Sequence, residues 1–256
     1  MNKIVNGLNI NYSDRGEGEP VVLLHGWGSN ISLFGSMTEV LCKKYRVIAM
    51  DMPGFGGSDE PKEVWDVDRY TDFVIEFLRD FGFKKITFLG HSFGGRVIIK
   101  MFEREHLPFE IDRLILTGSA GVVPKKTPKQ IRRQKIYKMT RKIYSSKLVT
   151  KFFPNALENL RRKNGSADYK AASPLMRQVL VKVVNEDLVH IFPKVTPSTM
   201  LIWGRNDTAT PLADGKLMEE TMPNAALVVL DNSGHYAFLD EMFAFNKILA
   251  SFMNID

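Results

Sequence analysis

The chain has 256 residues, of which 44% are hydrophobic and 25% are charged, and its formal net charge at pH 7 is +6. This length fits one large globular domain or a domain with an insertion, and the composition argues against a disordered chain. No apolar run approaches the ~18 residues of a membrane-spanning helix, and the N-terminus has no long apolar core, so we expect a soluble, cytoplasmic protein. Cys42 is the only cysteine and is interpreted as a small buried hydrophobe, so no disulfide can form within the chain.

Short apolar runs alternate with helical patterns along most of the chain. Residues 4–11 and the turn at residues 14–18 are typical of an edge hairpin. Further strands are predicted at residues 21–24, 46–50, 85–89, 113–117, 198–203 and 226–230. One helical face runs from Tyr70 to Phe81, and Gly82 stands at the usual terminating position. Strands that alternate with helices predict an α/β fold with a mostly parallel, doubly wound sheet.

Ser92 lies on a predicted bend between a strand and a helix, within the sequence GHSFGG (residues 90–95). Gly90 and Gly94 stand two residues before it and two residues after it. Such a bend holds its central residue in a sparsely allowed backbone conformation and brings neighbouring backbone too close for side chains, which glycines relieve. The pattern predicts that the Ser92 hydroxyl is exposed above the sheet. The alternative is a chance match in a glycine-rich loop.

Polar residues follow several predicted strands, at the edge where an open α/β sheet collects its functional groups. Asp207 follows the strand at residues 198–203, and His235 follows the last predicted strand. A serine hydroxyl needs an imidazole to take its proton, and the imidazole needs a carboxylate to fix its tautomer. Ser92, Asp207 and His235 can meet these needs. The sequence HGWG (residues 25–28) ends another strand, where its glycines suit either an anion-stabilising turn or a tight turn into the next helix.

Other titratable residues are weaker catalytic candidates. Asp51 lies beside three glycines and a proline, which favours a structural turn. Asp231 is close to His235 in the same loop, and Asp240 falls at the start of the last helix, so both are poor replacements for Asp207. The remaining histidines are interpreted as packing or solvated residues: His91, His106 and His190. Neither a His-Glu-x-x-His motif nor a phosphate loop is present, so we expect no metal and no cofactor.

Five motifs in this order resemble the α/β-hydrolase fold family, and the resemblance covers nearly the whole chain. The motifs are HGWG (residues 25–28), DMPGFGGS (51–58), GHSFGG (90–95), WGRND (203–207) and SGH (233–235). The resemblance implies that Ser92 is the nucleophile, Asp207 the triad acid and His235 the general base. It also implies that the backbone amides of Trp27 and Phe93 form the oxyanion hole, beside which the substrate binds. Because the elbow carries a serine and not an aspartate, the dehalogenase and epoxide-hydrolase branches are disfavoured.

Residues 122–197 break the alternation of strands and helices. They contain no clear buried strand, but helical patterns recur near residues 136–143 and 175–184, the second with the cap Ser173-Pro174. By the resemblance, this insertion is a helical lid on a core of residues 1–121 and 198–256. Such a lid would exclude water and shape the pocket. Its aromatic residues predict a hydrophobic portion of the substrate: Tyr137, Tyr144, Phe152, Phe153 and Phe192.

The surplus of positive charge lies wholly in this insertion. Residues 122–197 carry 18 Lys and Arg against 4 Asp and Glu, a net charge of +14, whereas the rest carries 17 against 25, a net charge of −8. A solvated helical face is the favoured interpretation. Attraction of an anionic substrate and weak contact with an acidic membrane surface are the alternatives. Nucleic-acid binding is disfavoured, because no nucleic-acid-binding module accompanies the charge.

Together these observations predict a cofactor-independent, carboxylesterase-like serine hydrolase that cleaves a small-molecule ester or a related acyl compound. Ser92 would attack the carbonyl, and His235 would carry the proton to the leaving group. The resemblance leaves other reactions open on the same residues: hydrolysis of carbon–carbon bonds in vinylogous diketones, thioester hydrolysis and cofactor-free peracid formation. A ligand receptor with little turnover is a further alternative, which the presence of all three catalytic residue types disfavours.

Overall fold

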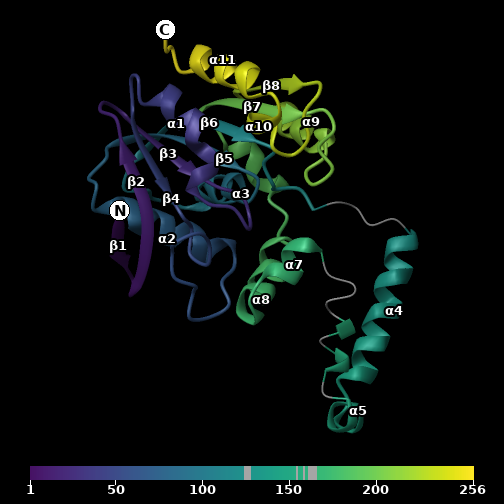
Figure 1. Ribbon diagram of the computed structural model, residues 1–256. Coiled ribbons are helices and arrows are strands. Elements are labelled where there is room, and N and C mark those ends of the chain that lie inside the picture. Colours follow the sequence, from purple (N-terminus) through teal and green to yellow (C-terminus); the bar gives the residue numbers. More distant parts are fainter. Residues whose placement is uncertain (124–127, 154, 158, 161–165) are drawn as a thin grey trace.

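The computed structural model describes residues 1–123, 128–153, 155–157, 159–160 and 166–256. Its centre is an eight-stranded sheet with the strand order β1-β2-β4-β3-β5-β6-β7-β8 (Figure 1). The strands are β1 Asn2–Val5, β2 Leu8–Arg15, β3 Pro20–Leu24, β4 Arg46–Met50, β5 Lys85–His91, β6 Glu110–Thr117, β7 Ser198–Gly204 and β8 Ala225–Leu230. Only β1–β2 and β2–β4 pair antiparallel, and every other neighbouring pair is parallel. The structure confirms the predicted α/β fold with a mostly parallel sheet.

Helices cover both faces of the sheet. Outside residues 122–197 they are η1 Ile31–Phe34, α1 Gly35–Leu41, α2 Val67–Arg79, α3 Phe93–Lys100, η2 Met101–Glu103, α9 Leu212–Thr221, α10 Ala237–Asp240 and α11 Met242–Phe252. Along β3, Val22 and Leu24 pack into the core that contains α2 and α3, whereas Val21 and Leu23 pack into the core that contains α1 and α11. Because successive side chains of a strand point to opposite faces, one apolar strand serves two cores. The sheet is therefore doubly wound, as predicted.

The N-terminal hairpin closes earlier than predicted. Its turn is Asn6-Gly7, with φ angles of 48° and 73°. A two-residue turn with both residues at positive φ matches the twist of the flanking strands, and Asn-Gly adopts it at low cost. Asp14 and Arg15 instead continue β2 and pair with β4. The hairpin turn expected at residues 14–18 was wrong, because β2 extends through its first two residues.

Residues 122–197 contribute helices and no strand to the part of the chain that the structure describes. The helices are α4 Pro128–Tyr144, α5 Lys147–Phe152, α7 Ala167–Ala171, α8 Pro174–Val183 and η3 Val189–Lys194. Figure 1 shows that α4 and α5 stand away from the sheet, whereas α7 and α8 lie close to the body. Ser173 caps α8 as predicted, because its side chain accepts a hydrogen bond from the Met176 amide at 3.2 Å. The division into a core and a lid stays a prediction, and no described helix is long and apolar enough to cross a membrane.

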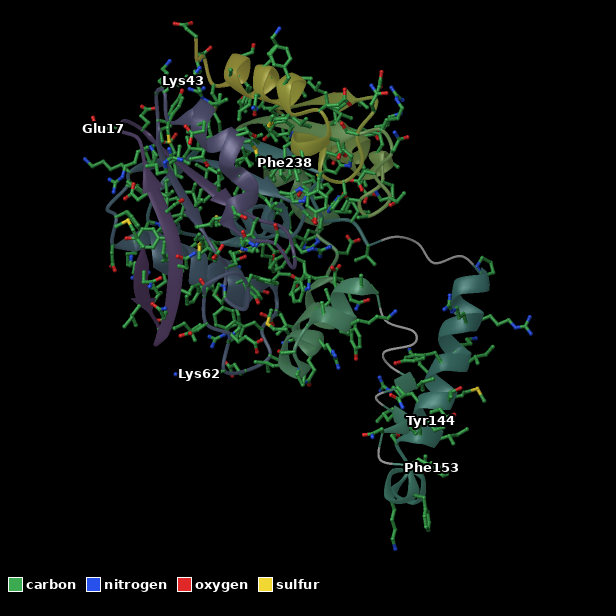
Figure 2. All side chains as sticks on the ribbon, viewed as in Figure 1. Glu17, Lys43, Lys62, Tyr144, Phe153 and Phe238 are labelled. Atoms are coloured by element: carbon green, nitrogen blue, oxygen red, sulfur yellow. The ribbon has the colours of Figure 1, made fainter. Side chains whose placement is uncertain are left out.

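The aromatic residues of this segment do not gather in one place. Phe192 of η3 is fully buried in the protein core, where it lies against Gly121. Phe152 and Phe153 are each 66% exposed, and Figure 2 shows Phe153 with Tyr144 at the far end of the α4 and α5 pair. Including Phe192 among the aromatic residues expected beside the substrate was therefore wrong, because its ring completes the core beside the sheet.

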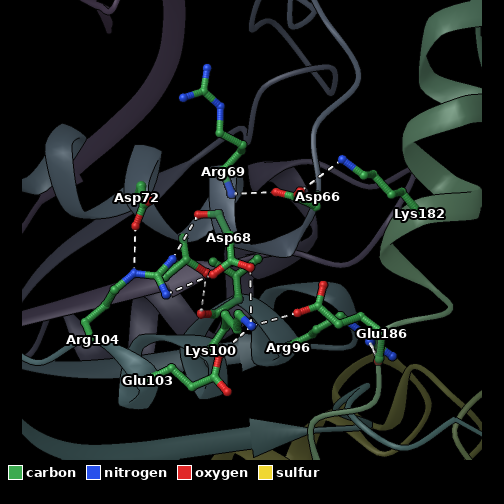
Figure 3. Close-up of polar contacts among 12 residues, drawn as sticks. Asp66, Asp68, Arg69, Asp72, Arg96, Lys100, Glu103, Arg104, Lys182 and Glu186 are labelled. Atoms are coloured by element: carbon green, nitrogen blue, oxygen red, sulfur yellow. Dashed lines mark hydrogen bonds and ion pairs between the residues drawn. The ribbon is translucent and has the colours of Figure 1, made fainter.

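A charged network joins α3 to the segment that follows α8 (Figure 3). The Lys100 side chain of α3 is only 9% exposed and forms ion pairs with three carboxylates, those of Asp68, Glu103 and Glu186. Arg96 donates a hydrogen bond to the backbone oxygen of Glu186. Burial alone lowers the pKa of Lys100, but its hydrogen bonds to the carboxylates and their charges outweigh burial and raise the pKa overall. Because removing one partner would leave a buried charge unpaired, this network fixes the segment that follows α8 against α3.

The helix α3 approaches the sheet so closely that glycines are required at the contact. A Cβ atom at Gly94 would lie 2.0 Å from the carbonyl oxygen of Leu24 in β3. A Cβ atom at Gly95 would lie 2.1 Å from the Ser119 hydroxyl oxygen, just beyond β6. The two glycines therefore set the distance between the helix and the strands.

Gly94→Ala should lower the free energy of unfolding by ~3 kcal/mol or more, because the β3 backbone cannot move without disturbing the sheet. Gly35→Ala is the matched control, since a Cβ atom at the start of α1 would meet no atom within 4 Å. We expect that control to change the free energy by less than about 1 kcal/mol. Urea titration of the two variants checks the difference, and a wild-type midpoint for Gly94→Ala would contradict it.

Candidate active site

Ser92 lies where β5 ends and α3 begins, as predicted. Its backbone angles are φ 51° and ψ −111°, a conformation that costs a residue with a side chain roughly 1–3 kcal/mol. Hydrogen bonds hold this conformation from both sides: the Ser92 amide donates to the carbonyl of Thr117, and the Ser92 carbonyl accepts from the amides of Arg96 and Ala120. The strained bend is thus fixed between β5, β6 and α3, at the carboxyl edge of the sheet.

Asp207 and His235 come together from the ends of β7 and β8. The Nδ1 atom of His235 lies 2.8 Å from Oδ2 of Asp207. The other oxygen of Asp207 accepts hydrogen bonds from the amides of Ala209 and Thr210 at 2.8 and 2.9 Å. Burial raises the pKa of Asp207, but the hydrogen bonds from His235 and Thr210 outweigh burial and lower it below its ordinary value. The ionised carboxylate therefore holds a proton on Nδ1 and leaves Nε2 as the proton acceptor.

Thr210 is a site residue that the sequence analysis missed. Its hydroxyl oxygen lies 2.9 Å from Oδ2 of Asp207, 2.9 Å from the Gly118 carbonyl and 3.2 Å from Nδ1 of His235. One hydroxyl thus links the carboxylate to the strand end of β6. The available signal was local: a threonine three residues after an aspartate is typical of a turn in which the carboxylate accepts backbone hydrogen bonds.

The loop that carries His235 is held by two carboxylates that follow it. Asp240 accepts a hydrogen bond from the Gly234 amide at 2.8 Å. Glu241 accepts from the Asn232 amide at 2.9 Å and from the Ser233 hydroxyl at 2.7 Å. Asp240 therefore supports the histidine loop and does not replace Asp207. Glu241 was missed, because only the fold brings it back to this loop.

The Ser92 hydroxyl forms no hydrogen bond with His235 in the described part of the chain. The two residues are neighbours through His91, whose ring centroid lies 4.7 Å from that of His235. Catalytic hydrogen bonds are often long in the free enzyme and shorten when the substrate binds. The structure thus joins Asp207 to His235, and the partnership of Ser92 with His235 stays a prediction.

The loop after β3 also lies close to the Ser92 bend. A Cβ atom at Gly26 would lie 3.2 Å from the Cβ atom of Ser92. Next to it, the Trp27 ring packs edge-on against the Phe93 ring, with centroids 5.6 Å apart. The two predicted oxyanion donors, the amides of Trp27 and Phe93, therefore belong to adjoining segments. Their contact with a substrate oxygen stays a prediction.

The buried side chain of His25 holds the loop after β3 in place. It is fully buried; Nδ1 donates to the Gly26 carbonyl at 2.7 Å, and Nε2 accepts from the Met52 amide at 3.0 Å. Burial lowers the pKa of His25, so the ring stays neutral and keeps one donor and one acceptor. The carboxylate of Asp51 supports the same region, because it accepts hydrogen bonds from Asn11 and from the Ile31 and Gly57 amides. This agrees with the structural role predicted for Asp51.

The remaining sequence candidates lie outside the acid and base pair. His91 is buried under the bend and donates from Nδ1 to the Thr117 carbonyl; burial, and then the neighbouring His235, lower its pKa to about 3. Asp231 forms an ion pair with Arg205. The Cys42 thiol is half-buried, His106 is exposed, and His190 is paired with Glu103. The described residues contain no His, Cys, Asp or Glu group suited to a metal ion, and the absence of a metal or cofactor stays an expectation.

Asp214 of α9 is a partly buried carboxylate near Asp207. Burial, and secondly the charge of Asp207, raise the pKa of Asp214 from 3.8 to about 6. The Asp214 carboxyl then binds a proton more tightly in the folded state than in the unfolded state. The free energy of unfolding therefore falls as the pH rises from about 4 to about 6 and beyond, where Asp214 loses its proton. Asp214→Asn should therefore be more stable than the wild type at about pH 8, and this gain should vanish near about pH 4.

Urea midpoints at the two pH values check this prediction. Glu220→Gln, which removes one negative charge at an exposed position on the same helix, is the matched control and should gain less stability at about pH 8 than Asp214→Asn. A gain for Asp214→Asn that is larger in acid would contradict the sign of the effect.

The family model described as alpha/beta hydrolase fold matches residues 19–242. The AB hydrolase superfamily protein YisY of Bacillus subtilis is 28% identical, with 94% of each chain covered. The 2-hydroxy-6-oxononadienedioate/2-hydroxy-6-oxononatrienedioate hydrolase 1 of Pseudomonas putida is also 28% identical, over 96% of this chain and 92% of its own. A solved esterase from Exiguobacterium antarcticum is 27% identical, with a TM-score of 0.75 over 98% of this chain and 97% of its own. Because the family model spans most of its length, this chain belongs to the alpha/beta hydrolase fold family.

Proposed function

We propose that the chain is a serine hydrolase that cleaves carboxylic esters through an acyl-enzyme on Ser92. The observation that carries the proposal is the 2.8 Å hydrogen bond between His235 and Asp207, at the sheet edge where Ser92 holds a strained bend. A polarised imidazole beside such a serine meets the requirement for activating a hydroxyl near neutral pH. A binding protein would have no need for this arrangement.

In this mechanism Ser92 Oγ attacks the ester carbonyl carbon while His235 Nε2 takes the hydroxyl proton. The tetrahedral intermediate collapses, and His235 gives that proton to the departing alkoxide oxygen. Water then attacks the acyl carbonyl with His235 as the base, and the carboxylic acid leaves with Ser92 restored. Asp207 stays ionised throughout and stabilises the imidazolium, in accord with the direction of its pKa shift.

The amides of Trp27 and Phe93 would stabilise the negative oxygen of the tetrahedral intermediate. Losing one such donor typically costs ~100-fold or more in turnover. The hydrogen bonds of His25 to both its own loop and the Met52 amide support this role, because a donor must be held in place before the reaction. Gly26 supports it as well, since a side chain there would meet Ser92.

The surroundings of Ser92 favour an apolar acyl or alcohol group. Trp27, Phe55 and Phe93 form one aromatic cluster, with Trp27 and Phe55 centroids 4.8 Å apart. Met176 of α8 packs against Gly54 in the neighbouring loop, where an added Cβ would lie 2.4 Å from its methyl carbon. Aromatic and thioether side chains at one edge of the site suit an uncharged substrate portion.

A carboxylate stands at another edge of the site. Asp168 of α7 lies near Gly28, since an added Cβ would be 3.8 Å from its Oδ1 atom. It also lies close enough to Tyr236, the neighbour of His235, that its charge adds to burial in raising the pKa of Tyr236. A substrate carboxylate near this position would be repelled. We therefore place neutral esters above the second candidate, carbon–carbon hydrolysis of dienedioates, which the Pseudomonas putida relative favours.

Hydrolysis of a p-nitrophenyl ester series from acetate to decanoate tests the proposal. We expect a clear optimum of chain length and a loss of about 10⁴-fold or more in kcat/KM for Ser92→Ala. Ser251→Ala, an exposed position on α11, should retain wild-type activity. Turnover of a vinylogous 1,5-diketone, with no Ser92-dependent ester hydrolysis, would move the proposal to carbon–carbon cleavage.

The role of Asp168 predicts a charge-dependent selectivity. Asp168→Asn should raise kcat/KM about three- to tenfold for an ester that ends in a carboxylate, because repulsion near an exposed group is screened but not abolished. A neutral ester of equal length should change by less than about twofold. Glu17→Gln controls for net charge, because Glu17 is exposed and lies at the upper left of the body in Figure 2, away from α7. An equal change on both esters would exclude a direct effect of the Asp168 charge.

A further inference from the structure

The helices α4 and α5, with the following Phe153, form an arm that stands away from the body (Figures 1 and 2). The helix α4 packs on α5, and none of their described side chains belongs to the two cores of the sheet. By contrast, α8 in the same segment buries four apolar side chains: Met176, Val179, Leu180 and Val183. The α4–α5 arm therefore has surface chemistry that the fold itself does not use.

The first part of that chemistry is unbalanced positive charge. Residues 128–144 contain seven Lys and Arg and no Asp or Glu, and residues 147–152 add two Lys. Among the described residues, no ion pair involves a cation of α4, whereas Lys182 of α8 pairs with Asp66. Cations that are close together and unpaired attract a surface of opposite charge.

The second part is an exposed apolar face within the same arm. Ile136, Met139 and Ile143 are 56%, 68% and 61% exposed. Their spacing of three and four residues places them on one side of α4. Phe152 and Phe153, at the end of α5, are also large apolar side chains, each 66% exposed. Large apolar side chains gathered on one surface are typical of an interaction site.

The cations lie directly beside this apolar face. Arg132 and Arg133 precede Ile136 by four and three residues, and Lys135 precedes Met139 by four, so each lies one turn from an apolar side chain. A polyanion such as nucleic acid would neutralise the cations and leave the apolar side chains in water. An anionic bilayer can contact both the cations and the apolar side chains, because phosphate headgroups lie directly above the acyl chains.

We propose that the α4–α5 arm docks on an anionic lipid surface. The helix α4 lies in the plane of the headgroups, its cations contact lipid phosphates, and Ile136, Phe152 and Phe153 enter the boundary with the acyl chains. This is peripheral attachment, consistent with the absence of a membrane-spanning helix among the described residues. The inference is independent of the reaction proposed for Ser92.

Flotation of the full chain with vesicles tests the inference. We expect binding to phosphatidylcholine vesicles that contain about one-third phosphatidylglycerol, and loss of that binding between about 50 mM and about 500 mM salt. Vesicles of phosphatidylcholine alone should bind at least about 100-fold more weakly. Failure to bind the anionic vesicles at low salt would overturn the proposal.

Charge-reversal variants locate the contact. Arg132→Glu, Arg133→Glu and Lys135→Glu together should weaken binding at least about 100-fold, because each basic residue near the surface contributes roughly fivefold. Acidic residues are tolerated near the start of a helix, so α4 should persist. The matched control reverses the charge of three exposed lysines of the body, Lys43, Lys62 and Lys216. This control should weaken binding to the vesicles less than about tenfold. Equal losses in the two triple variants would show net-charge attraction only and would overturn the arm as the docking surface.

A tryptophan in place of Phe153 reports insertion. In Phe153→Trp, the emission should shift to shorter wavelength on anionic vesicles and be quenched by brominated acyl chains, beyond any change in the wild type. Phe152→Ser with Phe153→Ser should weaken binding to the anionic vesicles about tenfold or more, because the apolar side chains that enter the boundary are lost. An unshifted emission, or equal affinity for an acidic polypeptide or RNA, would overturn a lipid surface as the partner.

Discussion

The close approach of α3 to the sheet is the constraint on which the site depends. Gly94 lets the helix backbone lie against the β3 carbonyl of Leu24, and Gly95 leaves room for the Ser119 side chain just beyond β6. With the helix pressed against both strands, the chain between β5 and α3 has no room for a relaxed turn. The positive φ of Ser92 is the result, and three backbone hydrogen bonds maintain it. Tight packing at the helix is thus converted into a fixed position for one hydroxyl group.

The charge states of the groups around that hydroxyl depend on their hydrogen-bond partners. Asp207 is partly buried but stays ionised, since Thr210 and two amides accompany His235 around it. His91 and His25 are buried without a carboxylate partner, so both stay neutral and serve as supports for neighbouring loops. Of the histidines near Ser92, His235 is the one with a carboxylate partner. This contrast favours it as the base.

Sequence patterns predicted the features that depend on local chemistry. Continuous apolar runs identified the strands, and strand ends located Ser92, Asp207 and His235. Two features were missed. The link from Thr210 to the end of β6 joins residues far apart in the chain. The support that Glu241 gives the histidine loop depends on the chain turning back through α10. The N-terminal turn was misplaced because residues 14–18 carry a loop signal as strong as that of Asn6-Gly7. Phe192 was misassigned because an aromatic residue in a helical pattern does not reveal which surface will cover it.

The insertion between β6 and β7 combines two kinds of helix, and the difference between them is energetic. The helix α8 obtains its stability from burial of its apolar side and from the ion pair of Lys182 with Asp66. The described side chains of α4 have neither source, and the like charges of this helix repel one another along seventeen residues. The rest of the chain is net negative, but the arm extends away from the body, so the charge of the body offsets that repulsion weakly. The stability of α4 should therefore depend on its surroundings in solution more than that of any helix packed on the sheet.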